Sequence, residues 1–202
     1  MRAAALHDWG KAHEVFQATL EGTIATDMER AEADAAGSPW AKSAGSHRSR
    51  HSRRYFRHEL ASALALLTEG RSLLDGEQEP DLVVYLVAAH HGRVRLGFRS
   101  MPGEVAPNGD DTAVMALGVV HGEELPPLDL GETSLPRARM DLSVMKLGSG
   151  PGGEPSWSQR MLPLRDRLDL GPFRLGYLEA VVRLADWRAS AAADQVVGEE
   201  LP

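Results

Sequence analysis

The segment LHDWGKAHEVFQ, residues 6–17, sets His7, Asp8 and Lys11 directly ahead of an apolar pattern. Val15 and Phe16 begin that pattern at the spacing of an amphipathic helix. Titratable groups so close to a core-forming segment point to a chemical role. This segment therefore predicts a helix whose start carries functional side chains and whose body anchors them in the core.

Other helical patterns follow at residues 54–70, 80–92, 156–171 and 171–195. Residues 112–155 instead contain β-branched residues with many Gly and Pro and no helical stripe, which favours short strands or irregular structure. The chain of 202 residues suits one domain. We expect a mainly α fold over residues 1–202, with a long basic loop at about 24–53 and an insertion at about 99–155, irregular or β around 112–155.

The chain has no cysteine, which excludes disulfide scaffolds and thiolate zinc sites. Any metal ion would be bound by histidine and carboxylate side chains. No apolar run reaches the roughly 20 residues of a membrane span, and the first residues lack the apolar core of a secretory signal. We therefore expect a cytoplasmic protein without a membrane partner.

The net charge of −7 is unevenly distributed. Residues 35–58 contain six basic side chains and no acid, and this stretch leads into His58. A second basic segment, RVRLGFR at 93–99, follows His91. Such segments suit the binding of a phosphate backbone, although a solvated surface explains them equally well. The expected nucleic-acid contacts are Arg48, Arg50, Arg53, Arg54, Arg93 and Arg95.

Histidine and aspartate interrupt the apolar runs of several helices. Each has an ordinary explanation alone, such as a helix cap, an ion pair or a favourable interaction with the helix dipole. Together they supply the imidazole and carboxylate ligands that divalent transition metals accept when thiolates are absent. The candidate metal ligands are His7, Asp8, His58, His90, His91 and Asp186. Two such ions can activate a water molecule and stabilise the leaving oxygen of a phosphodiester.

Four motifs occur in a fixed order, HDWGK at 7–11, RHELAS at 57–62, AAHHG at 88–92 and LADWRAS at 184–190. As a set they resemble the HD-domain nuclease of type I CRISPR interference, within the HD phosphohydrolase superfamily. The resemblance implies a helical HD fold and metal-dependent cleavage of single-stranded DNA. It implies two ions of manganese, nickel, cobalt or iron, with magnesium as an alternative. It also implies a superfamily 2 helicase in cis or in trans, and recruitment by the CRISPR surveillance complex.

Carried over to this chain, the resemblance makes Asp8 the bridge between two ions and a catalytic residue. His7 and Asp186 would hold the first ion, and His58, His90 and His91 would complete the second. Lys11 would contact the scissile phosphate or assist proton transfer, although a surface lysine fits its spacing equally well.

One departure concerns a further histidine that the family carries well upstream of the HD dipeptide, whereas only six residues precede His7. Either that ligand belongs to a preceding region, or the first ion has fewer ligands; His13, His47, His51 or His121 could replace it. Two other functions stay open. One is a phosphohydrolase acting on nucleotides or cyclic nucleotides, and the other is an inactive docking module.

Overall fold

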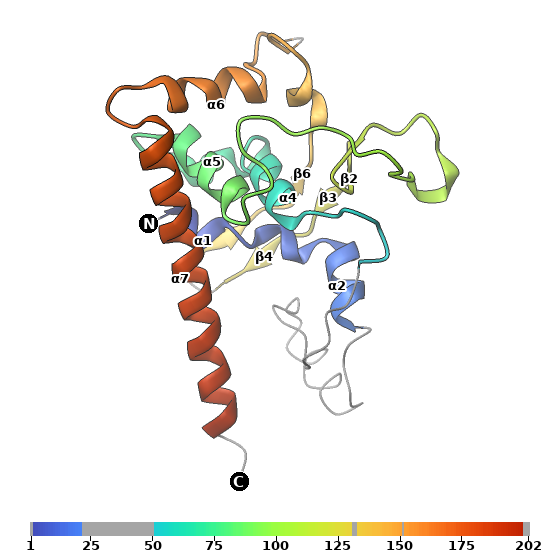
Figure 1. The fold of residues 1–202 in the computed structure, drawn as a ribbon. Helices are drawn as coiled ribbons and strands as arrows, with labels where there is room; N and C mark the ends of the chain where they lie inside the picture. The colour runs from blue at the N-terminus through green and yellow to red at the C-terminus, as the bar shows by residue number, and fades with distance from the viewer. Residues whose placement is uncertain (1, 22–50, 131–132, 151, 200–202) are drawn as a thin grey trace.

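The structure is a computed structural model that describes residues 2–21, 51–130, 133–150 and 152–199. Helices dominate it, and the strands are short and antiparallel (Figure 1). The principal α-helices are α1 (Arg2–Leu6), α2 (Glu14–Glu21), α4 (His58–Ala65), α5 (Pro80–Ala89), α6 (Trp157–Asp166) and α7 (Gly171–Glu199). Short 3-10 helices are η1 (Trp9–Ala12), η2 (Glu69–Leu74), η3 (Pro107–Gly109) and η4 (Leu142–Met145). The expected mainly α fold is confirmed.

Helix α4 forms the centre of the core, since all eight of its residues are buried. It packs against α5 on one side and η1 on another. The contact with η1 requires Gly10, because a Cβ there would lie 2.0 Å from the backbone oxygen of His58. The Gly10 amide donates a hydrogen bond to Ser62 Oγ at 2.7 Å. The glycine of the HDWGK segment thus brings His7 and Asp8 against the first turn of α4.

Helix α4 begins later than the sequence pattern predicts. The expected helix from residue 54 fails because Tyr55 has a positive φ of 67° and Arg57 is extended, with φ −126° and ψ 106°. The regular helix also ends at Ala65 and gives way to η2 instead of continuing to Gly70. The late start makes His58 the first residue of α4, where its side chain faces Asp8, the residue before η1.

Helix α5 agrees with its prediction more closely. Pro80 occupies the first turn, where its missing amide hydrogen costs nothing, and seven of the ten residues are buried. His90 and His91 follow directly, and Gly92 then adopts a positive φ of 72°. The paired histidines therefore lie at the sharp exit of a buried helix.

The insertion contains three two-stranded antiparallel ladders, as the composition of residues 112–155 predicts. Strand β1 (Met115–Ala116) pairs with β2 (Val119–Val120), β3 (Glu124–Leu125) with β6 (Ala138–Arg139), and β4 (Leu128–Asp129) with β5 (Ser134–Leu135). Gly118, with φ 73°, lies so close to the backbone of Phe56 that a Cβ would overlap it. The insertion therefore packs closely against the segment that precedes α4.

Helix α6 ends at Asp166, before the end of the helical pattern predicted at 156–171, and α7 begins at Gly171, where the second pattern is predicted to begin. Leu175 and Val182 of α7 are buried against the core, and the later turns of α7 extend away from the body of the molecule (Figure 1). None of the helices in the described ranges is long and apolar enough to cross a membrane.

Candidate metal centre

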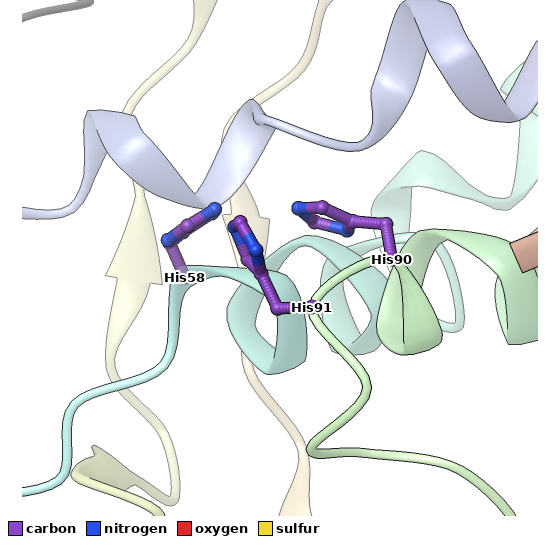
Figure 2. Close-up of side chains that lie close together, drawn as sticks. All are labelled: His58, His90 and His91. Atoms are coloured by element: carbon purple, nitrogen blue, oxygen red, sulfur yellow. The ribbon is translucent and has the colours of Figure 1, made fainter. Parts of the chain in front are cut away.

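Four segments far apart in the sequence bring histidine and aspartate side chains to one place. The turn between α1 and η1 carries His7 and Asp8, and α4 begins at His58. The end of α5 carries the two adjacent histidines, and α7 carries Asp186. Figure 2 shows the rings of His58, His90 and His91 gathered beside the N-terminal segment. We call this set the histidine–carboxylate cluster, comprising His7, Asp8, His58, His90, His91 and Asp186.

Asp8 lies between His7 and His58. Its Oδ1 is 3.3 Å from Nε2 of His58, and its Oδ2 is 3.3 Å from Nε2 of His7. The same His7 nitrogen is 3.4 Å from Oδ1 of Asp186. The two carboxylate oxygens of Asp8 therefore face different histidines, as the expected bridging role would require.

Hydrogen bonds to backbone carbonyls fix the tautomers of two histidines. Nδ1 of His7 is 2.9 Å from the carbonyl oxygen of Ala4, and Nδ1 of His90 is 2.7 Å from that of Val87. A carbonyl only accepts, so each Nδ1 carries the proton and each Nε2 presents a lone pair. Partners of this kind commonly orient metal-binding histidines.

The inward-facing nitrogens are buried and unsatisfied. Among the described residues, nothing forms a hydrogen bond with Nε2 of His7, His58 or His90. Buried polar atoms without partners are costly, and metal ions bound at this place would satisfy them. Ligand atoms of two sets lie within 4.8 Å of one another, namely His58 with His90 and His91, and His7 with Asp8 and His90. The donor set and its burial fit a divalent transition metal.

The protonation states of the cluster also suit metal binding. Burial, together with the neighbouring His91, lowers the pKa of His90 to about 3. Burial likewise lowers the pKa of His91. Burial would raise the pKa of Asp8, but contact with His58 and the charge of Lys11 outweigh it and lower that pKa. At neutral pH His90 therefore offers neutral imidazole and Asp8 offers a carboxylate, the forms in which each binds metal.

Helix α7 positions the cluster through two residues one turn apart. Asp186 approaches His7, and Arg183 donates a hydrogen bond from Nε to the carbonyl of His90 at 2.8 Å. Gly92 lies against the guanidinium of Arg183, where a Cβ would come within 3.1 Å. The α7 helix thereby fixes the turn that carries the paired histidines.

Lys11 lies at the edge of the cluster. Its Nζ is 2.7 Å from Oδ2 of Asp8, and it lies 6.0 Å from the centre of the Phe16 ring. Phe16 in turn packs edge-on against His58, with ring centres 5.4 Å apart. Lys11 is therefore held one helical turn from Asp8, within reach of anything bound there.

The six arginines that the sequence suggests as nucleic-acid contacts differ in their surroundings. Arg48 and Arg50 fall outside the described residues, as does most of the expected basic loop. Arg53 forms a bidentate ion pair with Glu123, and Arg95 pairs with Glu179. Arg54 lies 4.7 Å from the centre of the Tyr55 ring, and Arg93 is exposed.

The histidines considered as replacements for the upstream ligand have other partners. His13 contacts Glu123 at 3.2 Å, and its Nδ1 accepts a hydrogen bond from the Val15 amide. His51 contacts Thr19 at 2.9 Å, and His121 accepts a hydrogen bond from Leu142. His47 lies outside the described residues. No ligand set found among the described residues includes His13, His51 or His121.

Sequence reasoning missed two buried residues beside the cluster. Ser62 Oγ lies 2.8 Å from the carbonyl oxygen of His7 and 3.0 Å from that of His58, so one hydroxyl joins both ligand-bearing segments. Glu59 follows His58 and is fully buried. In the sequence, Glu59 has an ordinary explanation, because acidic residues in the first turn of a helix interact favourably with the helix dipole. Nothing in the sequence therefore indicates a second role for it.

In a comparison with protein-family models, residues 1–126 match the HD domain of Cas3. Searches of curated proteins and of solved structures found no match. The matched part contains the HD dipeptide, the RHE segment and the paired histidines, which are the features that bring the cluster together. The chain therefore belongs to the family of Cas3 HD domains, which are CRISPR-associated HD nucleases.

Proposed function

We propose that this chain is a metal-dependent nuclease that hydrolyses phosphodiester bonds of single-stranded DNA in CRISPR interference. The observation that carries the proposal is the convergence of three buried, unsatisfied Nε2 atoms, those of His7, His58 and His90, around Asp8. Family membership supports nuclease chemistry, and the donor set supports metal dependence.

His90 governs how the chain would divide its ligands between two ions. It belongs to both ligand sets, but its Nδ1 is engaged by Val87, which leaves one nitrogen for one ion. We assign His90 to the ion held with His58 and His91, where Asp8 Oδ1 is also near. His7, Asp8 and Asp186 would then hold the other ion, which we expect to bind more weakly because it has fewer protein ligands.

The two ions, of manganese, nickel, cobalt or iron, with magnesium as an alternative, would supply an activated water and charge stabilisation at the leaving oxygen. The chain's own residues set the geometry. Asp8 separates and orients the two histidine groups, and the Ala4 and Val87 carbonyls keep two imidazoles in the ligand tautomer. Lys11 would leave Asp8 and bind the scissile phosphate, where it also supplies a proton donor.

An open cavity of about 680 Å³ supports a path for the DNA strand. Its lining includes Arg53 and Arg54 together with Val15 of α2. The neighbouring residue of α2, Phe16, packs against His58, so that the cavity and the cluster share one helix. We propose that the exposed Arg54 and Arg93 contact the backbone phosphates. We also propose a superfamily 2 helicase in cis or in trans, recruitment by the CRISPR surveillance complex, and a cytoplasmic location.

Incubation of the purified protein with circular single-stranded DNA and Mn²⁺, Ni²⁺ or Co²⁺ tests the proposal. We expect nicking and then degradation, which EDTA abolishes. Intact DNA with every metal would refute the nuclease, and release of phosphate from small nucleotides instead would favour the phosphohydrolase. Substituting Arg54 and Arg93 with Gln should weaken DNA cleavage if they bind the strand, whereas hydrolysis of a small nucleotide would be unaffected.

A further inference from the structure

Glu59 is a buried carboxylate without a hydrogen bond. It is 0% exposed, and within the described parts of the chain neither of its oxygens has a hydrogen-bond partner. The nearest cationic or ionisable groups are Nδ1 of His58 at 3.7 Å and Nε of Arg57 at 4.0 Å. Both distances are too long for a hydrogen bond. A buried carboxylate left in this state needs an explanation, because folding alone disfavours it.

Glu179 shows how the same protein treats a buried carboxylate that has a structural role. It is 6% exposed, and it accepts hydrogen bonds from the Tyr85 hydroxyl at 2.5 Å and from Arg95 at 2.8–3.2 Å. These partners join α5, α7 and the segment that follows the paired histidines. Glu59 lacks any such set, which argues against a purely structural role.

The position of Glu59 relative to His58 suggests its role. His58 directs Nε2 toward Asp8 and Nδ1 toward Glu59. The corresponding Nδ1 atoms of His7 and His90 donate to carbonyls, whereas Nδ1 of His58 has no carbonyl partner among the residues described. Metal-binding histidines usually donate their second N–H to a carbonyl or a carboxylate. Glu59 lies where that partner is required.

A charge on Glu59 would also lie close to the candidate ligands, since Oε2 of Glu59 is 3.7 Å from Nδ1 of His58. Within the described residues, the set formed by His58, His90 and His91 contains no carboxylate, and Oδ1 of Asp8 lies beside it, 3.3 Å from Nε2 of His58. A second buried negative charge would favour a divalent cation there.

We propose that Glu59 is a positioning residue of the metal centre. It accepts a hydrogen bond from Nδ1–H of His58, fixes the tautomer that presents Nε2, and adds negative charge beside the set formed by His58, His90 and His91. The inference rests on the proposed metal-dependent function. It requires a small side-chain rotation that closes the 3.7 Å gap when His58 binds metal.

Glu59→Gln tests the proposal because it preserves shape and removes the charge. In Mn²⁺ titrations followed by calorimetry, we expect a 10- to 100-fold loss of affinity. In EDTA, the melting temperature should stay unchanged or rise, because an unpaired buried charge is lost. Unchanged Mn²⁺ affinity together with a lower melting temperature would overturn the proposal.

Glu179→Gln is the matched control. It should lower the melting temperature in EDTA and change Mn²⁺ affinity by less than about threefold. The His58→Ala background supplies a second test, since Glu59→Gln should have little further effect on affinity once its partner is absent. An equal loss in both backgrounds would show that Glu59 does not act through His58 and would overturn the positioning role.

A measurement on the wild-type protein covers the case in which Glu59→Gln does not fold. In ¹⁵N-histidine NMR of the Zn²⁺-loaded protein, the His58 proton should reside on Nδ1; a proton on Nε2 would overturn the proposal. Absence of any Mn²⁺ or Zn²⁺ binding by the wild type would instead refute the proposed function, a result distinct from each outcome above.

Discussion

The histidine–carboxylate cluster and a second histidine group lie at opposite ends of η1 and use the same residue types differently. The second group, which we call the His13 clamp, consists of His13, Glu123 and Arg53. His13 is 1% exposed and approaches Glu123, which also receives two hydrogen bonds from Arg53 and one from the Val120 amide. Both ring nitrogens of His13 have partners within the protein, and so do both carboxylate oxygens of Glu123. The cluster instead leaves three buried imidazole nitrogens without a hydrogen bond among the described residues.

This difference separates a structural histidine from a candidate ligand. The clamp joins η1 and the segment before α4 to the insertion, and its hydrogen bonds need nothing from outside. Its strong pairing is also evident in Glu123, where burial would raise the pKa but His13 and Arg53 hold it down at about 2. Residue type alone does not distinguish the two groups; the satisfaction of buried atoms does.

The largest expected effect is the loss of DNA cleavage in a variant that still folds. Asp8→Asn keeps the shape of the side chain but removes the charge that faces both His7 and His58. We expect cleavage of single-stranded DNA in Mn²⁺ to fall by at least about 1,000-fold, equivalent to about 4 kcal/mol. Cleavage within tenfold of the wild type would contradict the bridging role.

The converse effect is expected in the clamp. His13→Ala leaves a cavity and removes a partner of Glu123, and should cost about 3 kcal/mol of unfolding free energy in urea titrations. Its stoichiometry of bound Mn²⁺ should match the wild type at temperatures where the variant is folded. A variant that loses metal while keeping its stability would place His13 among the ligands.

Acidification should destabilise the metal-free protein through the cluster. The pKa of His90 falls from 6.5 to about 3 on folding. Below pH 6.5 the unfolded chain therefore binds more protons than the folded one, and the protein loses stability as the pH is lowered. Between pH 7 and 5 this amounts to about 2 kcal/mol. The depressed pKa of Asp8 acts only below about pH 4 and does not contribute in this range. Urea titrations in EDTA should show this loss in the wild type and a smaller one in His90→Asn, where the lowered pKa values of His91 and His51 still contribute.

The smallest expected effect concerns Lys11. Because its ammonium contacts Asp8, it competes with a cation for that carboxylate. Lys11→Gln should tighten Mn²⁺ binding severalfold, by less than about 1 kcal/mol, while slowing DNA cleavage. Weaker Mn²⁺ binding, measured by calorimetry, would show that Lys11 supports the centre instead of competing for Asp8.

The sequence predicted a helix well where the apolar periodicity agrees with residues that favour helix starts and ends. Helix α5 has a proline at its start and a glycine soon after its end, and it occurs as expected. Helix α4 begins four residues late, because Tyr55 has a left-handed conformation that leaves no mark in the apolar pattern. The next residue, Phe56, packs with its backbone against Gly118 of the insertion, a long-range contact that the pattern does not show either. The strands of the insertion were predicted as a region only, since each has two residues and no periodicity to read.

The candidate ligands were predicted from motifs, and the structure brings all six into one cluster, in which Asp186 approaches His7 and Asp8 approaches both His7 and His58. The roles of their neighbours could not be predicted. His13 and Arg53 look like site residues in the sequence, but both are engaged by Glu123, about 110 and 70 residues away. Glu59 looks like an ordinary first-turn acid. Whether a buried group is satisfied depends on long-range contacts, which a single sequence does not reveal.

The most direct test of the central claim is the metal content of wild type, Asp8→Asn and His13→Ala, determined by elemental analysis after dialysis against Mn²⁺ and removal of free ion. We expect about two equivalents in the wild type and in His13→Ala, and less than one in Asp8→Asn. No retained metal in the wild type, or equal content in the wild type and Asp8→Asn, would contradict it.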